Sequence, residues 1–232
     1  MPGNGDLATG GITVTVGGTH LPSLLARLEA DDPDTVREAV ESVEDAVTDD
    51  AWACVPTVPK LRGLLERDAI DFRDTVAYCL AELAAQSPED VAPSVETISR
   101  YTRTATTSGQ AQALRCLTHV AAERPGAVAA HLEAVLAALE EAPEDEGIVQ
   151  WGIACLSELA ADGCGDLEAA RPALETALED DRVAVRRNAC LVIGHGQVSA
   201  VLDHLETVAA DEPNPEVRKR AIWALEQARD GD

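Results

Sequence analysis

The sequence predicts an all-α protein, a right-handed α-solenoid of about six helical hairpins. Three observations lead there: a core poor in aromatic residues, helical spacing of apolar residues, and a repeat of nearly constant length. Apolar residues make up 46% of the 232 residues, but aromatic ones only 3%. A core of Ala, Val and Leu suits close helix packing better than a β-sandwich, whose strands favour aromatic and β-branched residues.

The repeat appears in two ladders of apolar residues, which we call anchors. One anchor per unit lies on each predicted first helix and one on each predicted second helix. Because self-similarity at 20 to 50 residues indicates a solenoid, two ladders in step over six units are strong support for this fold. First-helix anchors are Leu24, Leu61, Ile98, Val135, Leu174 and Leu205, spaced by 37, 37, 37, 39 and 31 residues. Second-helix anchors are Val43, Leu80, Leu117, Leu156, Ile193 and Leu225, spaced by 37, 37, 39, 37 and 32.

Each unit is predicted to contain a first helix of about ten to fifteen residues, a turn, and a second helix. Apolar residues of the second helix recur at i, i+4 and i+8, on one stripe. Acidic turns at residues 31–33, 180–181 and 211–215 are expected to cap second helices at their N-termini. Gly126 and the glycines at 163 and 165 are expected where helices stop.

The last two units carry a local motif. Residues 211–225 read DEPNPEVRKRAIWAL, and residues 185–193 repeat the pattern Val-Arg-x-x-Ala-x-x-x-Ile. This pattern resembles the HEAT repeat, particularly the short form called phycobilisome-lyase-like. Units between residues 21 and 161 keep the period, but Gly109 and Ile148 replace the motif Val, and Gln110 and Val149 replace the motif Arg. The resemblance implies a HEAT/armadillo-like superhelix whose second helices line the concave side.

Two segments are expected along the chain. Residues 1–20 form a Gly-rich leader, in which residues 12–16 (Ile-Thr-Val-Thr-Val) alternate as in a short strand. The leader is either flexible or an edge strand offered to a partner. Residues 21–232 are expected to form a single HEAT-like repeat domain of about six helix pairs.

The chain is strongly acidic, with 42 acidic and 18 basic residues and a net charge of -24. Self-repulsion of this size is tolerable when concentrated salt shortens the Debye length to roughly 3 Å at 1 M. Only Lys60 and Lys219 are lysines. This composition resembles proteins of salt-in halophiles; an ordinary acidic cytosolic protein is the alternative. Because the chain shows neither a signal-peptide pattern nor a run of ~18 apolar residues, a cytoplasmic location away from membranes is expected.

The cysteines do not suggest a disulfide or a zinc site. There are six, and no two are spaced as Cys-x-x-Cys. Cys79, Cys116 and Cys155 each precede an anchor leucine. Equivalent residues on stacked helices lie about 8–10 Å apart, which is beyond the reach of a disulfide. They are therefore expected to be small core residues.

The histidines do not form a metal-binding pattern either, since none pairs with another at i+3 or i+4. HEAT-like di-iron hydroxylases carry His-Glu dipeptides, and this chain has none; the His-x-Glu sequences at 131–133 and 204–206 place the Glu on another face. The Gly-flanked residues 193–197 lack the spacing of a phosphate loop and predict the end of a helix. No catalytic residue, metal or cofactor is expected.

The candidate binding surface lies on the outward positions of the second helices. The C-terminal part of this surface lies in a segment whose charge differs from that of the rest of the chain, because residues 181–230 hold eight acidic and seven basic residues. Arg and Trp are enriched at binding hot spots. The competing interpretation is that Arg186 and Arg218 pair with aspartates in adjacent turns and that Trp223 caps the terminal hairpin. The candidate residues are Tyr78, Arg115, Trp151, Arg187, Lys219, Arg220 and Trp223.

The function expected from these features is a non-enzymatic scaffold or adaptor that binds a protein partner through the second helices. One alternative is an accessory subunit of a modifying enzyme, or a lyase-like protein, although no residue set for such chemistry is found. Another is a nucleic-acid-binding HEAT-like protein, which the sequence pI near 4.4 disfavours because phosphate binding requires a continuous basic track. A small-molecule ligand is not expected.

Overall fold

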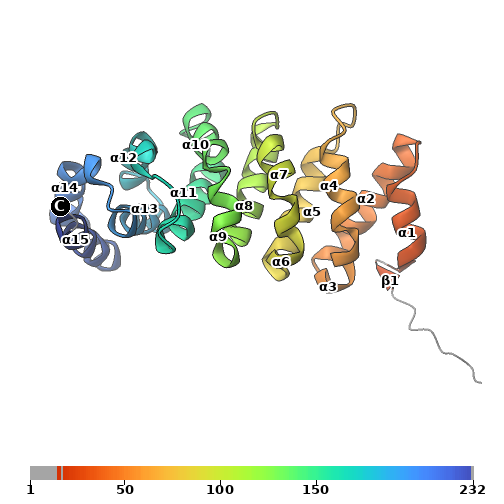
Figure 1. Cartoon of the computed structure of the whole chain (residues 1–232), viewed down its shortest axis with the longest axis horizontal. Helices are drawn as coiled ribbons and strands as arrows, with labels where there is room; N and C mark the ends of the chain where they lie inside the picture. Colours follow the sequence, from red (N-terminus) through yellow and green to blue (C-terminus); the bar gives the residue numbers. More distant parts are fainter. Residues whose placement is uncertain (1–14, 17, 231–232) are drawn as a thin grey trace, which may run out of the picture.

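The protein is an α-solenoid. A computed structural model describes residues 15–16 and 18–230. Helix pairs stand side by side along the long axis, with α1 at one end and α15 at the other (Figure 1). The all-α solenoid expected from the sequence is confirmed. First helices are α1 (Leu21–Leu28), α4 (Val58–Leu65), α7 (Val95–Thr102), α10 (Leu132–Glu141), α12 (Arg171–Leu178) and α14 (Leu202–Asp211). Second helices are α2 (Pro33–Val47), α5 (Arg73–Gln86), α8 (Thr107–Glu123), α11 (Glu146–Ala161), α13 (Val183–Gly196) and α15 (Pro215–Asp230).

The first helices are interrupted, which the apolar ladder did not reveal. Short helices and single 3-10 turns precede several of them. Two of the 3-10 turns contain Pro56 and Pro93. Proline lacks an N–H and its ring clashes with the carbonyl four residues earlier, so the α-helical hydrogen bonds break there. The extra segments are α3 (Ala51–Cys54), α6 (Pro88–Val91), α9 (Pro125–Ala129) and the 3-10 turns Val55–Thr57, Ala92–Ser94, Glu168–Ala170 and Ser199–Val201.

Three second helices, α2, α8 and α11, begin at a side-chain cap, whereas α5 and α13 do not, so the cap expected from residues 180–181 is not formed. Thr106 accepts a hydrogen bond from the N–H of Gly109, and Asp145 accepts one from the N–H of Ile148, over 3.2 and 2.9 Å. Asp32 does the same for α2 over 3.0 Å. Each cap satisfies a backbone donor that has no partner within the helix. All three caps stand eleven residues before the second-helix anchor, so the period of the repeat fixes the helix start as well as the core.

The core runs through the whole row of helix pairs. All twelve anchors are buried, the most exposed being Leu225 at 8%. Each second helix packs on the next second helix, and each first helix on the next first helix, so the molecule has two layers. No helix within the described residues is long and apolar enough to cross a membrane.

Helix ends follow the glycine pattern only in part. Gly163 follows α11 and has a φ of 66°, in the left-handed region that glycine adopts without strain. The expectation for Gly126 was wrong, because α8 already ends at Glu123 and Gly126 lies inside α9. The helix end predicted at residues 193–197 is confirmed, with Gln197 as the left-handed residue after α13 at a φ of 50°.

A short β-hairpin precedes the first helix pair. Strands β1 (Thr15–Val16) and β2 (Thr19–His20) are antiparallel, with Val16 opposite Thr19. The Val16 side chain is 1% exposed and lies in the core beside α2. Most of the predicted strand at 12–16 lies outside the described residues, and its use as an edge for a partner stays a prediction.

Candidate protein-binding surface

Two clusters of side chains lie on the second helices, at positions two, five or six residues before the anchor or two residues after it. Since each residue advances the helix by 100°, these positions lie roughly opposite the buried anchor. We call them the central cluster, on α5, α8 and α11, and the C-terminal cluster, on α13 and α15. The central cluster is Tyr78, Glu82, Arg115, His119 and Trp151. The C-terminal cluster is Arg187, His195, Lys219, Arg220 and Trp223.

Arg115 is the centre of the central cluster. Its Nη1 donates to Oε1 of Glu82 on the preceding second helix over 2.6 Å, and both side chains are 21% exposed. Its guanidinium carbon also lies 5.6 Å from the ring centroid of Trp151 on the following second helix. A cation this close to an aromatic face is attracted by the ring. Arg115 therefore bridges three helices, and its charge is largely used inside the protein.

Tyr78 and His119 flank Arg115 and are half-buried. Burial raises the pKa of Tyr78, and the nearby carboxylates of Glu82 and Glu44 add to this effect. Burial also lowers the pKa of His119, and the positive charge of Arg115 lowers it further. Both effects favour the uncharged form of His119, and its Nε2 is buried without a hydrogen-bond partner among the described residues.

The aromatic member of the C-terminal cluster is tightly packed. A Cβ added to Gly194 would lie 2.4 Å from an atom of the Trp223 ring, so only glycine permits this approach. The Trp223 ring also contacts His195, with the two ring centroids 4.8 Å apart. Trp223 is half-buried against α13, so it joins the last two second helices and leaves only part of its ring for a partner.

The cations of the C-terminal cluster are accessible. Arg187, Lys219 and Arg220 are all exposed. Within residues 18–230, none of the three forms an ion pair; Arg187 makes only a long hydrogen bond of 3.4 Å to Asn188. All three are therefore available to an acidic group from outside.

The two motif arginines have a structural role, but their partner differs from the expected aspartates. Arg186 donates to both carboxylate oxygens of Glu212, over 2.8 and 2.9 Å. It also donates to the backbone oxygens of Asp180 and Asp181. Arg218 donates to the backbone oxygen of Glu212 over 2.7 Å. Glu212 is thus the shared acceptor in the adjacent turn, and Arg186 holds its pKa below the usual range.

Three members of the clusters were absent from the sequence prediction, namely Glu82, His119 and His195. All three stand two residues after a second-helix anchor. This position differs by only 40° from that of Tyr78 and Arg115, two residues before the anchor. The same register that selected Tyr78 would have found them, had the position two residues after the anchor been included.

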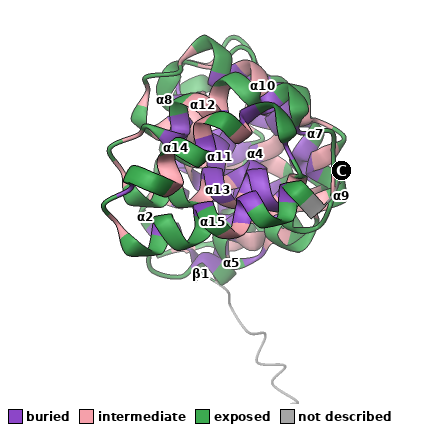
Figure 2. Ribbon diagram, turned by 90° about the vertical axis from the view of Figure 1, so that its left-hand side faces the viewer, coloured by how far each residue is buried: buried purple, intermediate pink, exposed green. Residues whose placement is uncertain are grey.

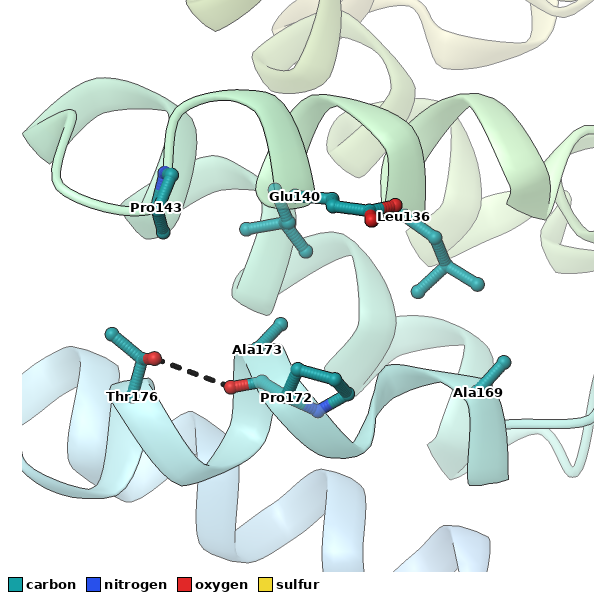
Figure 3. Close-up of a pocket in the computed structure, with 8 residues that line it drawn as sticks. Leu136, Glu140, Pro143, Ala169, Pro172, Ala173 and Thr176 are labelled. Atoms are coloured by element: carbon teal, nitrogen blue, oxygen red, sulfur yellow. Dashed lines mark hydrogen bonds between the residues drawn. The ribbon is translucent and has the colours of Figure 1, made fainter.

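Other polar and apolar features lie outside this surface. A cleft of about 300 Å³ lies on the first-helix side, between α10 and α12, and is lined mainly by apolar groups with Glu140 at its rim (Figure 3). The Thr176 hydroxyl there donates to the backbone oxygen of Pro172. Cys79, Cys116 and Cys155 are buried and free, as expected for core residues. Among residues 15–16 and 18–230, no group of three or more His, Cys, Asp or Glu could hold a metal ion.

Comparisons with known proteins agree with the architecture. A family model described as HEAT repeats matches residues 132–226. None of the curated proteins matches the chain. Among solved structures, an engineered protein from the Northeast Structural Genomics Consortium is similar at a TM-score of 0.72 and 19% identity, over 90% of this chain and 96% of that one. A designed armadillo repeat protein in complex with the peptide (KR)4 gives 0.73 and 15%, over 90% and 99%.

A second engineered protein from the same consortium is similar at a TM-score of 0.70 and 22% identity, over 91% of this chain and 99% of that one. At 15–22% identity, these similarities show a shared fold and nothing more. Residues 132–226 match HEAT repeats, and the whole described chain has the armadillo/HEAT-type solenoid fold.

Proposed function

We propose that the protein is a non-enzymatic scaffold that binds a protein partner along the surface of its second helices. The observation that carries this proposal is the central cluster. Arg115, Trp151 and Tyr78 come from three successive second helices, and half-buried Arg, Trp and Tyr side chains are typical of binding hot spots. The contact of Arg115 with Trp151 and its ion pair with Glu82 hold this part of the cluster in place before a partner arrives, which reduces the entropy lost on binding.

The charge along this surface suggests the orientation of the partner. On the first unit, Glu41 is exposed and Glu44 is half-buried, and Glu44 lies close enough to Tyr78 to influence its pKa. At the other end stand the unpaired cations Arg187, Lys219 and Arg220. A polypeptide segment with basic residues toward α2 and acidic residues toward α15 would complement both ends. The designed armadillo protein of similar fold was solved with a peptide of alternating Lys and Arg, and we infer a related mode of peptide binding here.

We further infer that the protein works in concentrated salt. A net charge of -24 is spread over most helices, and salt screens the repulsion between these charges. Ionic steering is weak under such conditions, so the aromatic and apolar contacts of the central cluster would supply most of the affinity.

The proposal is tested by affinity capture from the native host, at the salt concentration of its own cytoplasm, with three forms of the protein. The first is the wild type. The second is the triple variant Arg187→Ala, Lys219→Ala and Arg220→Ala, which removes exposed, unpaired cations of the second helices. A matched control removes three exposed arginines of the first-helix side, and thus the same charge: Arg100→Ala, Arg103→Ala and Arg171→Ala.

We expect the second-helix variant to lose the captured partner at least about tenfold, which corresponds to about 1.4 kcal/mol, and the control to retain it. Circular dichroism must show equal helicity for the three forms. Equal recovery of the same proteins by the wild type and the second-helix variant would show that the C-terminal cluster does not contribute to binding. Loss in the control alone would place the interaction on the first helices.

A further inference from the structure

The last second helix exposes a position that is buried in every other unit. Three residues before the anchor, the side chain points toward the next unit of the solenoid. Residues at this position are 0–2% exposed in the first five units, but Ile222 on α15 is 47% exposed. The five buried equivalents are Val40, Ala77, Leu114, Ile153 and Cys190. Figure 2 looks at the molecule from this end.

The first helix of the last unit shows the same change. Val208 and Ala209 on α14 are half-buried, whereas the equivalent Ala177 and Leu178 on α12 are 0% and 2% exposed. Ile222, Val208 and Ala209 thus belong to the face that an additional helix pair would cover in a longer stack. Among the described residues, none covers it.

Polar residues around Ile222 are arranged symmetrically. Arg218 and Glu226 lie four residues before and four residues after it, hence one turn away on the same face of α15. Both are exposed. Within residues 18–230 neither forms an ion pair, and Arg218 donates only to a backbone oxygen. If two copies of α15 packed antiparallel about a two-fold axis at Ile222, each Arg218 would face Glu226 of the second copy.

We propose that this end face binds a second copy of the chain, so that two solenoids join at their C-terminal ends in a two-fold symmetric dimer. A two-fold interface must be self-complementary, since the same patch serves both partners. The face meets this requirement, with Ile222 against itself at the centre and an Arg–Glu pair on each side. This inference does not depend on the proposed partner of the second helices.

The distribution of charge also favours this end of the molecule for contact between copies. Residues 181–230 hold eight acidic and seven basic residues, while the other units carry most of the net charge of -24. Repulsion between two copies is therefore least when they approach through α14 and α15. Because two helices per copy bury little area, we expect weak association, with a Kd on the order of 100 µM.

The first test is sedimentation equilibrium of the full chain from about 5 to 500 µM in about 0.15 M salt. The average mass of the wild type should rise from that of a monomer, 24.4 kDa, toward twice that value. Ile222→Asp should lower the association constant at least about tenfold, because it places carboxylates against each other at the centre of the interface. Val183→Asp is the matched control, since Val183 is 41% exposed and lies on α13.

The second test uses charge reversal to identify the geometry. Arg218→Glu and Glu226→Arg should each abolish self-association, because like charges then face each other twice. An equimolar mixture of the two variants should form a dimer again, since one copy then carries two acidic groups where the other carries two arginines. Thermal melts of each variant, followed by circular dichroism, check that α15 remains folded.

A wild type that stays monomeric over the whole range would overturn the proposal, as would an Ile222→Asp variant that associates like the Val183→Asp control. If the charge-reversal variants associate no better in the mixture than alone, the copies do not pair two-fold about Ile222. Masses beyond a dimer would indicate head-to-tail stacking, which generates open filaments and would also contradict the two-fold arrangement.

Discussion

Replacement of Arg186 by alanine should destabilise the last two units more than any exposed substitution. Arg186 makes two hydrogen bonds to the carboxylate of Glu212 and one each to the backbone oxygens of Asp180 and Asp181. The Glu212 side chain is only 3% exposed. Without Arg186, its carboxylate retains the N–H of Asn214, at 2.9 Å, as a donor. Keeping a carboxylate buried away from water without its main partner is strongly unfavourable in free energy.

The expected loss follows from these contacts. Breaking a buried ion pair by removing one partner costs about 3–5 kcal/mol, and water that enters the space left by Arg186 would reduce this value. We therefore expect a loss of about 3 kcal/mol in the free energy of unfolding, which lowers the Tm by about 6–12 °C in a chain of this length. Urea titration followed by circular dichroism at constant salt measures the change.

Two controls identify Glu212 as the cause. A double-mutant cycle with Glu212→Gln should give a coupling energy of about 2 kcal/mol. The pH dependence gives the second control. Arg186 lowers the pKa of Glu212 below its ordinary 4.5 in the folded protein, so the pair stabilises the protein above that pH and the stabilisation disappears as the pH falls through the folded pKa. The difference between wild type and variant should shrink in acid. A loss under about 1 kcal/mol, or zero coupling, would refute the reasoning.

Further substitutions and conditions test other parts of the structure. Gly194→Ala should cost about 1–3 kcal/mol and shift the fluorescence of Trp223, because the new methyl group overlaps its ring; an unchanged spectrum would contradict this packing. Thr106→Ala should cost about 1 kcal/mol by removing the cap of α8, as urea titration would show. Raising NaCl from about 0.1 to 1 M should raise the Tm, because the Debye length falls from about 10 to 3 Å; a lower Tm would speak against repulsion. In the native state, a thiol reagent should modify Cys164 first, since the other five cysteines are buried; mass spectrometry of digested protein checks the order.

The repeat could be predicted from the sequence alone because the anchors are a local and periodic signal. Every unit must bury one residue from each helix at the same place, so Leu80 and Leu117 can be recognised without knowing what they touch. The breaks in the first helices were less visible. Pro56 and Pro93 lie close to apolar residues that continue the helical spacing, and a ladder of single anchors carries no information on where the backbone turns into 3-10 geometry.

The sequence predicted where the candidate surface lies, but not which of its charged side chains are paired. Helical rotation puts Arg115 and Arg187 on the outward side of the second helices. Arg115, however, pairs with a glutamate 33 residues earlier, and such a contact depends on the register between neighbouring helices. For the same reason, the carboxylate that accepts from Arg186 is that of Glu212 and not that of an aspartate of the turn. Sequence alone thus identified cations but not which of them remain unpaired.

Site-specific photocrosslinking in the native host tests the central claim, that the second helices bind a protein, most directly. Tyr78→benzoylphenylalanine places the reactive group in the central cluster, whose half-buried tyrosine it resembles in shape. Arg100→benzoylphenylalanine places it on an exposed position of the first-helix side as the control. The account predicts a discrete covalent adduct with another protein from position 78 and none from position 100. Adducts from position 100 alone, or equal adducts from both positions, would contradict it.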